Sequence, residues 1–254
     1  MTLRQLFAPS PFVVVGAAAV SAWLEMTWRR THDVDLVVLT DAQQAARDLQ
    51  ALGFAQHPRL EHRWVAPSGL PADILPVTEG QLRVGKLVWP QSRNEMSLTG
   101  VELALRHNVE VSVGRGQSVH VATLPCLVIA KMAAWLERPD ERLRDLEDLG
   151  QILTSYLAID DMRRWNDESL RVVEFDDQGA HVLGKDLAEI TKPVHRKLVE
   201  TFLRECGSRP SAIDQMARGL PLSTRDPHET IEARLRLMHQ GLSAAKTRRR
   251  GRSH

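Results

Sequence analysis

The stretch "RRTHDVDLVVLT", residues 29–40, places two aspartates at the front of an apolar run that predicts a buried strand. Residues two apart in a strand point to the same face, so Asp33 and Asp35 should project side by side. The opposite face takes Val34, Leu36 and Val38. Two neighbouring carboxylates repel each other unless a positive group lies between them. Because Mg²⁺ prefers carboxylate and phosphate oxygens, the pair is a candidate metal site.

A third carboxylate has a similar position in "PADILPV", residues 71–77, where Asp73 opens another apolar strand. Three carboxylates on neighbouring strands could hold two Mg²⁺ ions. Two such ions can activate an attacking oxygen and stabilise a leaving one in phosphoryl or nucleotidyl transfer. The bland alternative is that Asp33 ends a loop and Asp73 follows a turn proline.

A possible anion site lies earlier in the chain, where a short strand over Phe12 to Val15 ends at Gly16. Ala17 and the small residues after it favour a helix that begins at this glycine. Free backbone N–H groups at a helix N-terminus attract anions, and small side chains let a phosphate approach closely. Ordinary tight packing between strand and helix explains the same pattern.

A lysine in an apolar helix is a further candidate. Lys131 is the only charged residue between Leu124 and Leu136, so it needs an anionic partner or a route to water. The segment "RLRDLEDL", residues 142–149, predicts another helix, whose leucines define its core face. On that face Asp145 points inward and could pair with Lys131 or Arg29. Asp148 falls further round, towards solvent.

Strands and helices alternate in the first half of the chain, whereas helical periodicity dominates the second half. We therefore expect an α/β (α+β) fold with a mixed sheet, followed by a helical region. The expected parts are an α/β core over residues 1–123, a helical region over 124–245, and a basic flexible tail over 246–254. Residues 171–185, "RVVEFDDQGAHVLGK", are predicted to form a loop or a small hairpin.

Composition adds little about function. The chain has 254 residues, of which 43% are hydrophobic and 26% charged, and a net charge of +1, so overall charge indicates neither an acidic nor a basic partner. The basic end, "KTRRRGRSH", is predicted to be a solvated tail, and the alternative is a weak contact to RNA or DNA phosphates. Two cysteines without metal-ligand spacing favour a reducing, cytoplasmic location. Neither a signal peptide nor a membrane-spanning run is expected, and hence no membrane partner.

Taken in order, these elements resemble the DNA polymerase beta-like nucleotidyltransferases, and among them the AbiEii/AbiGii toxins of type IV toxin–antitoxin and abortive-infection systems. The resemblance covers roughly residues 12–153. Its closest local matches are the pattern R-x-T-x-D-x-D, formed by Arg29, Thr31, Asp33 and Asp35, and the segment "RDLEDL", residues 144–149.

The resemblance implies a site as well as a fold. It implies two Mg²⁺ ions on Asp33, Asp35 and Asp73, and it implies that the helical region contributes to the active site. Asp33, Asp35, Asp73, Lys131 and Asp145 are the expected catalytic residues. The nucleoside triphosphate (NTP) is expected to bind Gly16, Ala17, Arg29, Thr31, Lys131 and Asp148.

The leading hypothesis is a Mg²⁺-dependent nucleotidyltransferase that acts on RNA or tRNA as a toxin, with a cognate antitoxin as a possible partner. Asp73 is its best base candidate, since the third carboxylate lies nearest the attacking oxygen in the superfamily that the chain resembles. Two alternatives remain open. One is a transferase that modifies a small molecule such as an aminoglycoside. The other is a catalytically degenerate protein that binds a nucleotide or a protein partner, which the Gly16-Ala17 pair favours.

Overall fold

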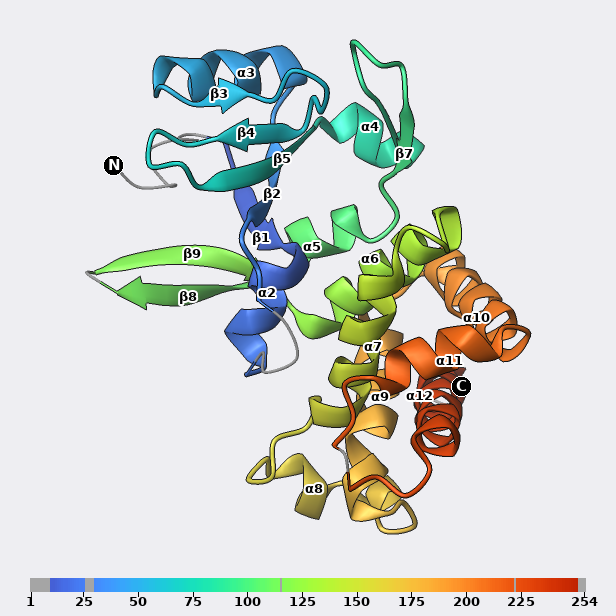
Figure 1. Cartoon of the computed structure of the whole chain (residues 1–254). Helices are drawn as coiled ribbons and strands as arrows, with labels where there is room; N and C mark the ends of the chain where they lie inside the picture. The colour runs from blue at the N-terminus through green and yellow to red at the C-terminus, as the bar shows by residue number, and fades with distance from the viewer. Residues whose placement is uncertain (1–9, 26–29, 115, 222, 251–254) are drawn as a thin grey trace. The chain divides into compact units, whose positions relative to one another are not determined.

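The computed structural model describes residues 10–25, 30–114, 116–221 and 223–250. The chain divides into two compact units, with the boundary between Leu127 and Val128. This boundary falls inside helix α6 (Leu124–Glu137), a few residues beyond the boundary expected at residues 123–124. The first unit contains the sheets and the second is helical (Figure 1).

A seven-stranded mixed sheet forms the first unit, in the order β3-β4-β5-β2-β1-β9-β8. β2 pairs in parallel with β5 and β1 with β9, whereas the remaining neighbours are antiparallel. The predicted mixed α/β fold is therefore confirmed. The strands of this sheet are β1 (Phe12–Val15), β2 (Val34–Leu39), β3 (Ala55–Gln56), β4 (Arg63–Val65), β5 (Pro71–Val77), β8 (Asn108–Gly114) and β9 (Gln117–Ala122).

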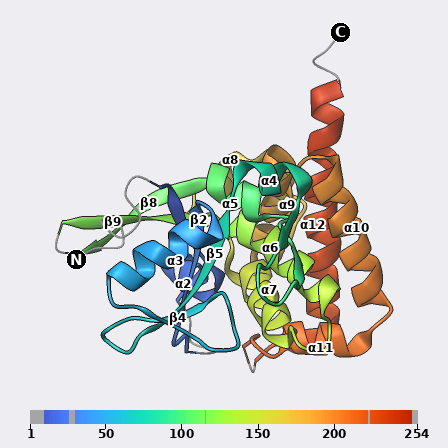
Figure 2. The same ribbon diagram turned by 90° about the horizontal axis from the view of Figure 1, so that it is seen from above.

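Among the residues that the structure describes, four short helices and a small hairpin complete this unit. They are α2 (Gly16–Trp23), α3 (Ala42–Ala51), α4 (Glu79–Val84), α5 (Val101–Arg106), and the hairpin of β6 (Lys86–Val88) with β7 (Glu95–Ser97). The β8–β9 hairpin extends away from the other strands in both views (Figures 1 and 2), and most of β8 is exposed.

The two faces of the central strands differ in polarity. Leu36 and Val38 on β2 lie beside Ile74 and Pro76 on β5, and this face is buried under α3. The opposite face carries the aspartates, as the alternation of the sequence predicts. The start of α3 is fixed by a capping residue: the carboxylate of Asp41 accepts a hydrogen bond from the backbone N–H of Gln44 at 2.9 Å.

The second unit begins inside α6 and otherwise consists of the helices that follow it in the chain. They are α7 (Leu143–Ser155), α8 (Arg163–Asn166), η1 (Glu168–Leu170), η2 (Phe175–Asp177), α9 (Gln178–Ile190), α10 (Pro193–Gly207), α11 (Pro210–Ala217) and α12 (Pro227–Arg250). α9 packs along α12 (Figure 1). In the part of the chain that the structure describes, no helix combines the length and apolar character needed to cross a membrane.

The prediction for residues 171–185 was wrong, because most of this stretch belongs to η2 and α9. Its two glycines argue against a helix by propensity alone. Tertiary packing overrides that preference: a Cβ added at Gly184 would overlap the backbone of Met238 in α12, and one at Gly241 would overlap His181. Glycine thus lets the two helices approach closely.

The predicted basic tail is also partly helical. α12 continues through Arg250, so the first residues of the expected flexible segment 246–254 have helical backbone. The rest of that segment lies outside the described residues.

Candidate active site

Two of the predicted aspartates lie side by side on neighbouring strands of the sheet. Asp35 on β2 is the direct partner of Asp73 on β5, and directly opposed residues project to the same face. Asp33 comes immediately before β2, two residues from Asp35. The strand pairing therefore brings the three carboxylates together, as the sequence predicts, at the start of two parallel strands. We call them the carboxylate row.

An arginine that the sequence analysis did not single out bridges this row. Arg63 on β4 donates from Nε and Nη2 to the two carboxylate oxygens of Asp73, both at 2.8 Å. Its Nη2 also lies 3.1 Å from Oδ2 of Asp33. Hydrogen bonding to Asp73 raises the pKa of Arg63 above its already high ordinary value, and the charges of Asp33 and Asp35 add to this effect. The guanidinium thus serves as the counter-charge of the row.

A signal for Arg63 was present in the sequence. The strands β4 and β5 form a hairpin around the "SG" turn, and Val65 pairs with Pro71. Counting two residues away from the turn on each strand pairs Arg63 with Asp73, an opposite-charge pair across neighbouring strands. Fixing the register of this hairpin would have placed the arginine in the site.

The predicted glycine lies against the carboxylate row. Gly16 has a φ of +64° and begins α2, and a Cβ added to it would overlap the carboxylate of Asp35. No side chain caps the N-terminus of α2, and its first turn holds no acidic residue. Glycine is needed here for both reasons: its positive φ is strained for other residues, and its missing side chain makes room for Asp35. Ala17, the next residue, is buried.

The hydroxyl of Thr31 orients the first aspartate. Its Oγ1 donates towards the backbone oxygen of Asp33 at 3.2 Å and towards the carboxylate Oδ1 at 3.3 Å. Thr31 therefore borders the carboxylate row, whereas the predicted Arg29 lies outside the described residues.

The donor set of the row suits a hard divalent cation. Three carboxylates and one guanidinium leave a formal net charge of −2, and carboxylate oxygens are the ligands that Mg²⁺ prefers. As they lie, however, no group of three or more His, Cys, Asp and Glu side chains among the described residues could hold a metal ion. Arg63 engages Asp33 and both oxygens of Asp73, the oxygens that such an ion would need. A metal ion would have to displace it.

The second unit contains another ionic cluster, formed by Lys131, Asp145 and Asp148. The lysine Nζ lies 2.9 Å from Oδ1 of Asp145 and 2.7 Å from Oδ2 of Asp148. Only 7% of the lysine side chain and none of that of Asp148 are exposed. Burial alone would lower the pKa of Lys131, but the two carboxylates outweigh it and hold that pKa above its ordinary value. This ammonium is charged and paired within the protein.

One prediction for this cluster is confirmed and one is wrong. Asp145 pairs with Lys131, as expected. Asp148, however, is more deeply buried than Asp145, not turned towards solvent. The expected core face was too narrow: Leu146, Leu149 and Leu153 are buried as predicted, but Leu143 is exposed and the buried surface extends round the helix to include Asp148. Asp148 is one turn beyond Asp145, so both carboxylates face Lys131 on α6.

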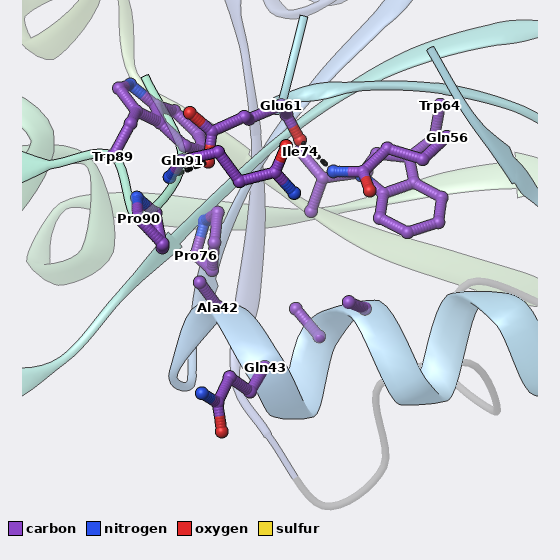
Figure 3. A pocket seen from close by; sticks show the side chains of 12 residues that line it. Ala42, Gln43, Gln56, Glu61, Trp64, Ile74, Pro76, Trp89, Pro90 and Gln91 are labelled. Carbon is purple, nitrogen blue, oxygen red and sulfur yellow. Dashed lines mark hydrogen bonds between the residues drawn. The ribbon is translucent and has the colours of Figure 1, made fainter. Parts of the chain in front are cut away.

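A pocket of about 260 Å³ lies on the other face of the sheet from the aspartates (Figure 3). Ile74 and Pro76 of β5 line it together with α3 and the two tryptophans Trp64 and Trp89. Glu61 at its rim is held in place, since the backbone N–H of Gln91 donates to its carboxylate at 2.9 Å. None of the predicted site residues lines this pocket.

Comparison with known proteins gives only weak likenesses. No protein-family model and no curated protein matches the chain. An antigenic nucleotidyltransferase-like protein from Paracoccidioides brasiliensis is 13% identical, with a TM-score of 0.40 over 84% of this chain and 87% of its own. JHP933 from Helicobacter pylori is 14% identical, with a TM-score of 0.44 over 98% and 93%.

A third solved structure, that of the antibiotic-resistance factor ANT(2'')-Ia, is 13% identical, with a TM-score of 0.37 over 81% of this chain and 86% of its own. Because these TM-scores are below 0.5, the likenesses do not establish a shared fold or a shared activity.

Proposed function

We propose that the chain is a Mg²⁺-dependent nucleotidyltransferase, which transfers a nucleoside monophosphate from an NTP to an acceptor hydroxyl. The single observation that carries this proposal is the carboxylate row, in which Asp35 and Asp73 face each other on parallel strands with Asp33 beside them. Carboxylates gathered on one face of a sheet repel one another and are costly unless they bind a cation.

In the proposed reaction the acceptor oxygen forms a bond to the α-phosphorus of the NTP. The bond from that phosphorus to the oxygen bridging to the β-phosphate breaks, and pyrophosphate leaves with the electron pair. Asp33, Asp35 and Asp73 would hold the Mg²⁺ ions, which would supply charge stabilisation for the attacking and leaving oxygens.

Asp73 is the proposed acceptor of the hydroxyl proton. Both of its carboxylate oxygens accept hydrogen bonds from Arg63, which stabilise the charged carboxylate and would weaken it as a base while they persist. Thr31 would keep Asp33 oriented through the contact of its hydroxyl with the carboxylate.

The triphosphate is proposed to lie at the start of α2, near Gly16 and Ala17. The support is that this N-terminus has no side-chain cap and that Gly16 directly adjoins Asp35. Ala17 contributes no hydroxyl, so phosphate contacts here would use backbone N–H groups. Roles for Arg29, Lys131, Asp145 and Asp148 in binding the nucleotide or in catalysis remain predictions from the sequence.

The proposed acceptor is RNA, in particular tRNA, and the proposed role is that of a toxin restrained by an antitoxin. This part rests on the resemblance of "RRTHDVDLVVLT" to the AbiEii/AbiGii pattern. The deciding experiment incubates the full chain with each labelled NTP, Mg²⁺ and total tRNA, and follows label in RNA and release of pyrophosphate.

We expect Mg²⁺-dependent transfer by the wild type and its loss in Asp33→Asn. The matched control is Asp48→Asn. Asp48 lies on α3, on the other side of the sheet, and its carboxylate accepts a hydrogen bond from the side chain of Gln44. Asp48→Asn should transfer at the wild-type rate. Absence of transfer to RNA and to added aminoglycosides, or equal rates for Asp33→Asn and the wild type, would refute the proposal.

A further inference from the structure

Arg63 occupies the place in the carboxylate row where a cation is needed. It binds Asp73 through two parallel N–H···O contacts, a geometry that suits the planar guanidinium, and it reaches Asp33 with the same Nη2. A metal ion that binds both aspartates would use the same carboxylate oxygens. The guanidinium and the metal therefore compete for one set of ligands.

The surroundings of Arg63 permit this exchange. About a third of its side chain is exposed, and Asp33 is exposed to a similar extent. The main chain of β4 is fixed by its pairing with β5, but the long arginine side chain can withdraw into water by rotation about its own bonds. Because the side chain is already partly exposed, the guanidinium can withdraw into water without an unpaired charge being buried.

We propose that Arg63 is a tethered counter-cation, which holds Asp33 and Asp73 together without metal and must leave them when a divalent ion binds. The inference rests on the proposed function only in taking the carboxylate row as the metal site. This role predicts that removing Arg63 strengthens metal binding, because the site loses its competitor and gains one negative charge. A purely structural role does not predict an increase in metal affinity.

The test measures binding of Mn²⁺, which also takes carboxylate ligands, to the purified full chain without nucleotide. Electron paramagnetic resonance counts the free Mn²⁺ during a titration. We expect Arg63→Gln to lower the dissociation constant about tenfold or more. Arg63→Lys keeps the charge but loses the two-pronged contact, and its affinity should fall between those of the wild type and Arg63→Gln.

Arg47→Gln is the matched control. Arg47 is exposed on α3 and donates only to Gln44 in the described contacts, so its removal changes the net charge equally but leaves the row intact. It should bind Mn²⁺ as the wild type does. Circular dichroism spectra and melting curves check that each variant is folded.

Two outcomes overturn the inference. The first is that Arg63→Gln binds Mn²⁺ no more tightly than the wild type although Asp35→Asn abolishes binding; the metal site then stands and only the role of Arg63 fails. The second is that neither the wild type nor Arg63→Gln binds Mn²⁺ at the row, in which case the proposed function loses its metal site as well.

Discussion

The carboxylate row of the first unit and the Lys131 cluster of the second have the same components, carboxylates bridged by one cation, in opposite surroundings. Arg63 and Asp33 are about one-third exposed. Lys131 and Asp148 are almost completely buried. The buried cation cannot leave its partners without stranding their charges, whereas the exposed one can exchange with an ion from solution. Exposure thus distinguishes the two clusters, and it is the property on which the proposed metal binding by the carboxylate row depends.

The largest expected effect concerns the row. Asp35→Asn should lower nucleotide transfer about 10⁴-fold, equivalent to about 5 kcal/mol of activation barrier, because a metal ligand is lost. The same change should alter the free energy of unfolding much less, since asparagine keeps the size and shape of the side chain. Transfer rates and urea titrations measure the two quantities. A stable protein with unchanged activity would show that the row is not the active site.

Lys131→Met, in contrast, should mainly lower the free energy of unfolding. It leaves Asp145 and Asp148 without their cation, and breaking a buried ion pair on one side costs about 3–5 kcal/mol. Urea unfolding followed by circular dichroism gives this value. The combined variant Lys131→Met, Asp145→Asn, Asp148→Leu removes all three charges and should recover most of the loss. If the single variant is as stable as the wild type, the cluster is not the buried ionic link described above.

Gly16→Ala tests the contact between α2 and the row. The positive φ of Gly16 and the overlap with Asp35 should together cost about 2–3 kcal/mol. Gly69→Ala is the matched control, because Gly69 also has a positive φ, +84°, but nothing lies near its added Cβ. It should cost about 1 kcal/mol. Equal losses in thermal unfolding for the two variants would mean that Asp35 does not restrict position 16.

The smallest effect is expected from the half-buried ion pair between Asp167 and Lys185, and it depends on pH. Burial raises the pKa of Asp167, but hydrogen bonds from Lys185 and Ser169 outweigh it and lower that pKa to about 2. A carboxyl whose pKa is lowered on folding stabilises the protein above its unfolded value, and this contribution disappears as the pH falls from about 4 towards 2. Asp167→Asn should therefore lose at most about 1 kcal/mol at neutral pH and nothing near pH 2. Unfolding titrations at both pH values distinguish this from a pH-independent loss.

The parts of the site that came from the sequence are those with a local pattern. Asp33, Asp35 and Asp73 stand at the front of apolar strands, and Gly16 separates a strand from a run of small residues. Such patterns follow from strand alternation and glycine geometry, which act over a few residues. Arg63 has no pattern of its own, and its role arises only from the register of β4 against β5.

The errors in the fold have the same origin. The glycines in residues 171–185 indicate a loop locally, whereas in the structure Gly184 lets α9 pack against the backbone of α12. The leucines of α7 alone predicted that Asp148 faces solvent. That prediction failed because the periodicity of one helix does not show which of its faces other helices cover. Contacts between distant segments decided each of these positions.

The most direct test of the central claim is a crystal structure with Mn²⁺ and a non-hydrolysable NTP, analysed by anomalous scattering from manganese. We expect anomalous peaks at the carboxylates of Asp33, Asp35 and Asp73, with the guanidinium of Arg63 moved away from Asp73. No manganese at the row, with Arg63 still bridging Asp33 and Asp73 in the presence of the nucleotide, would contradict it.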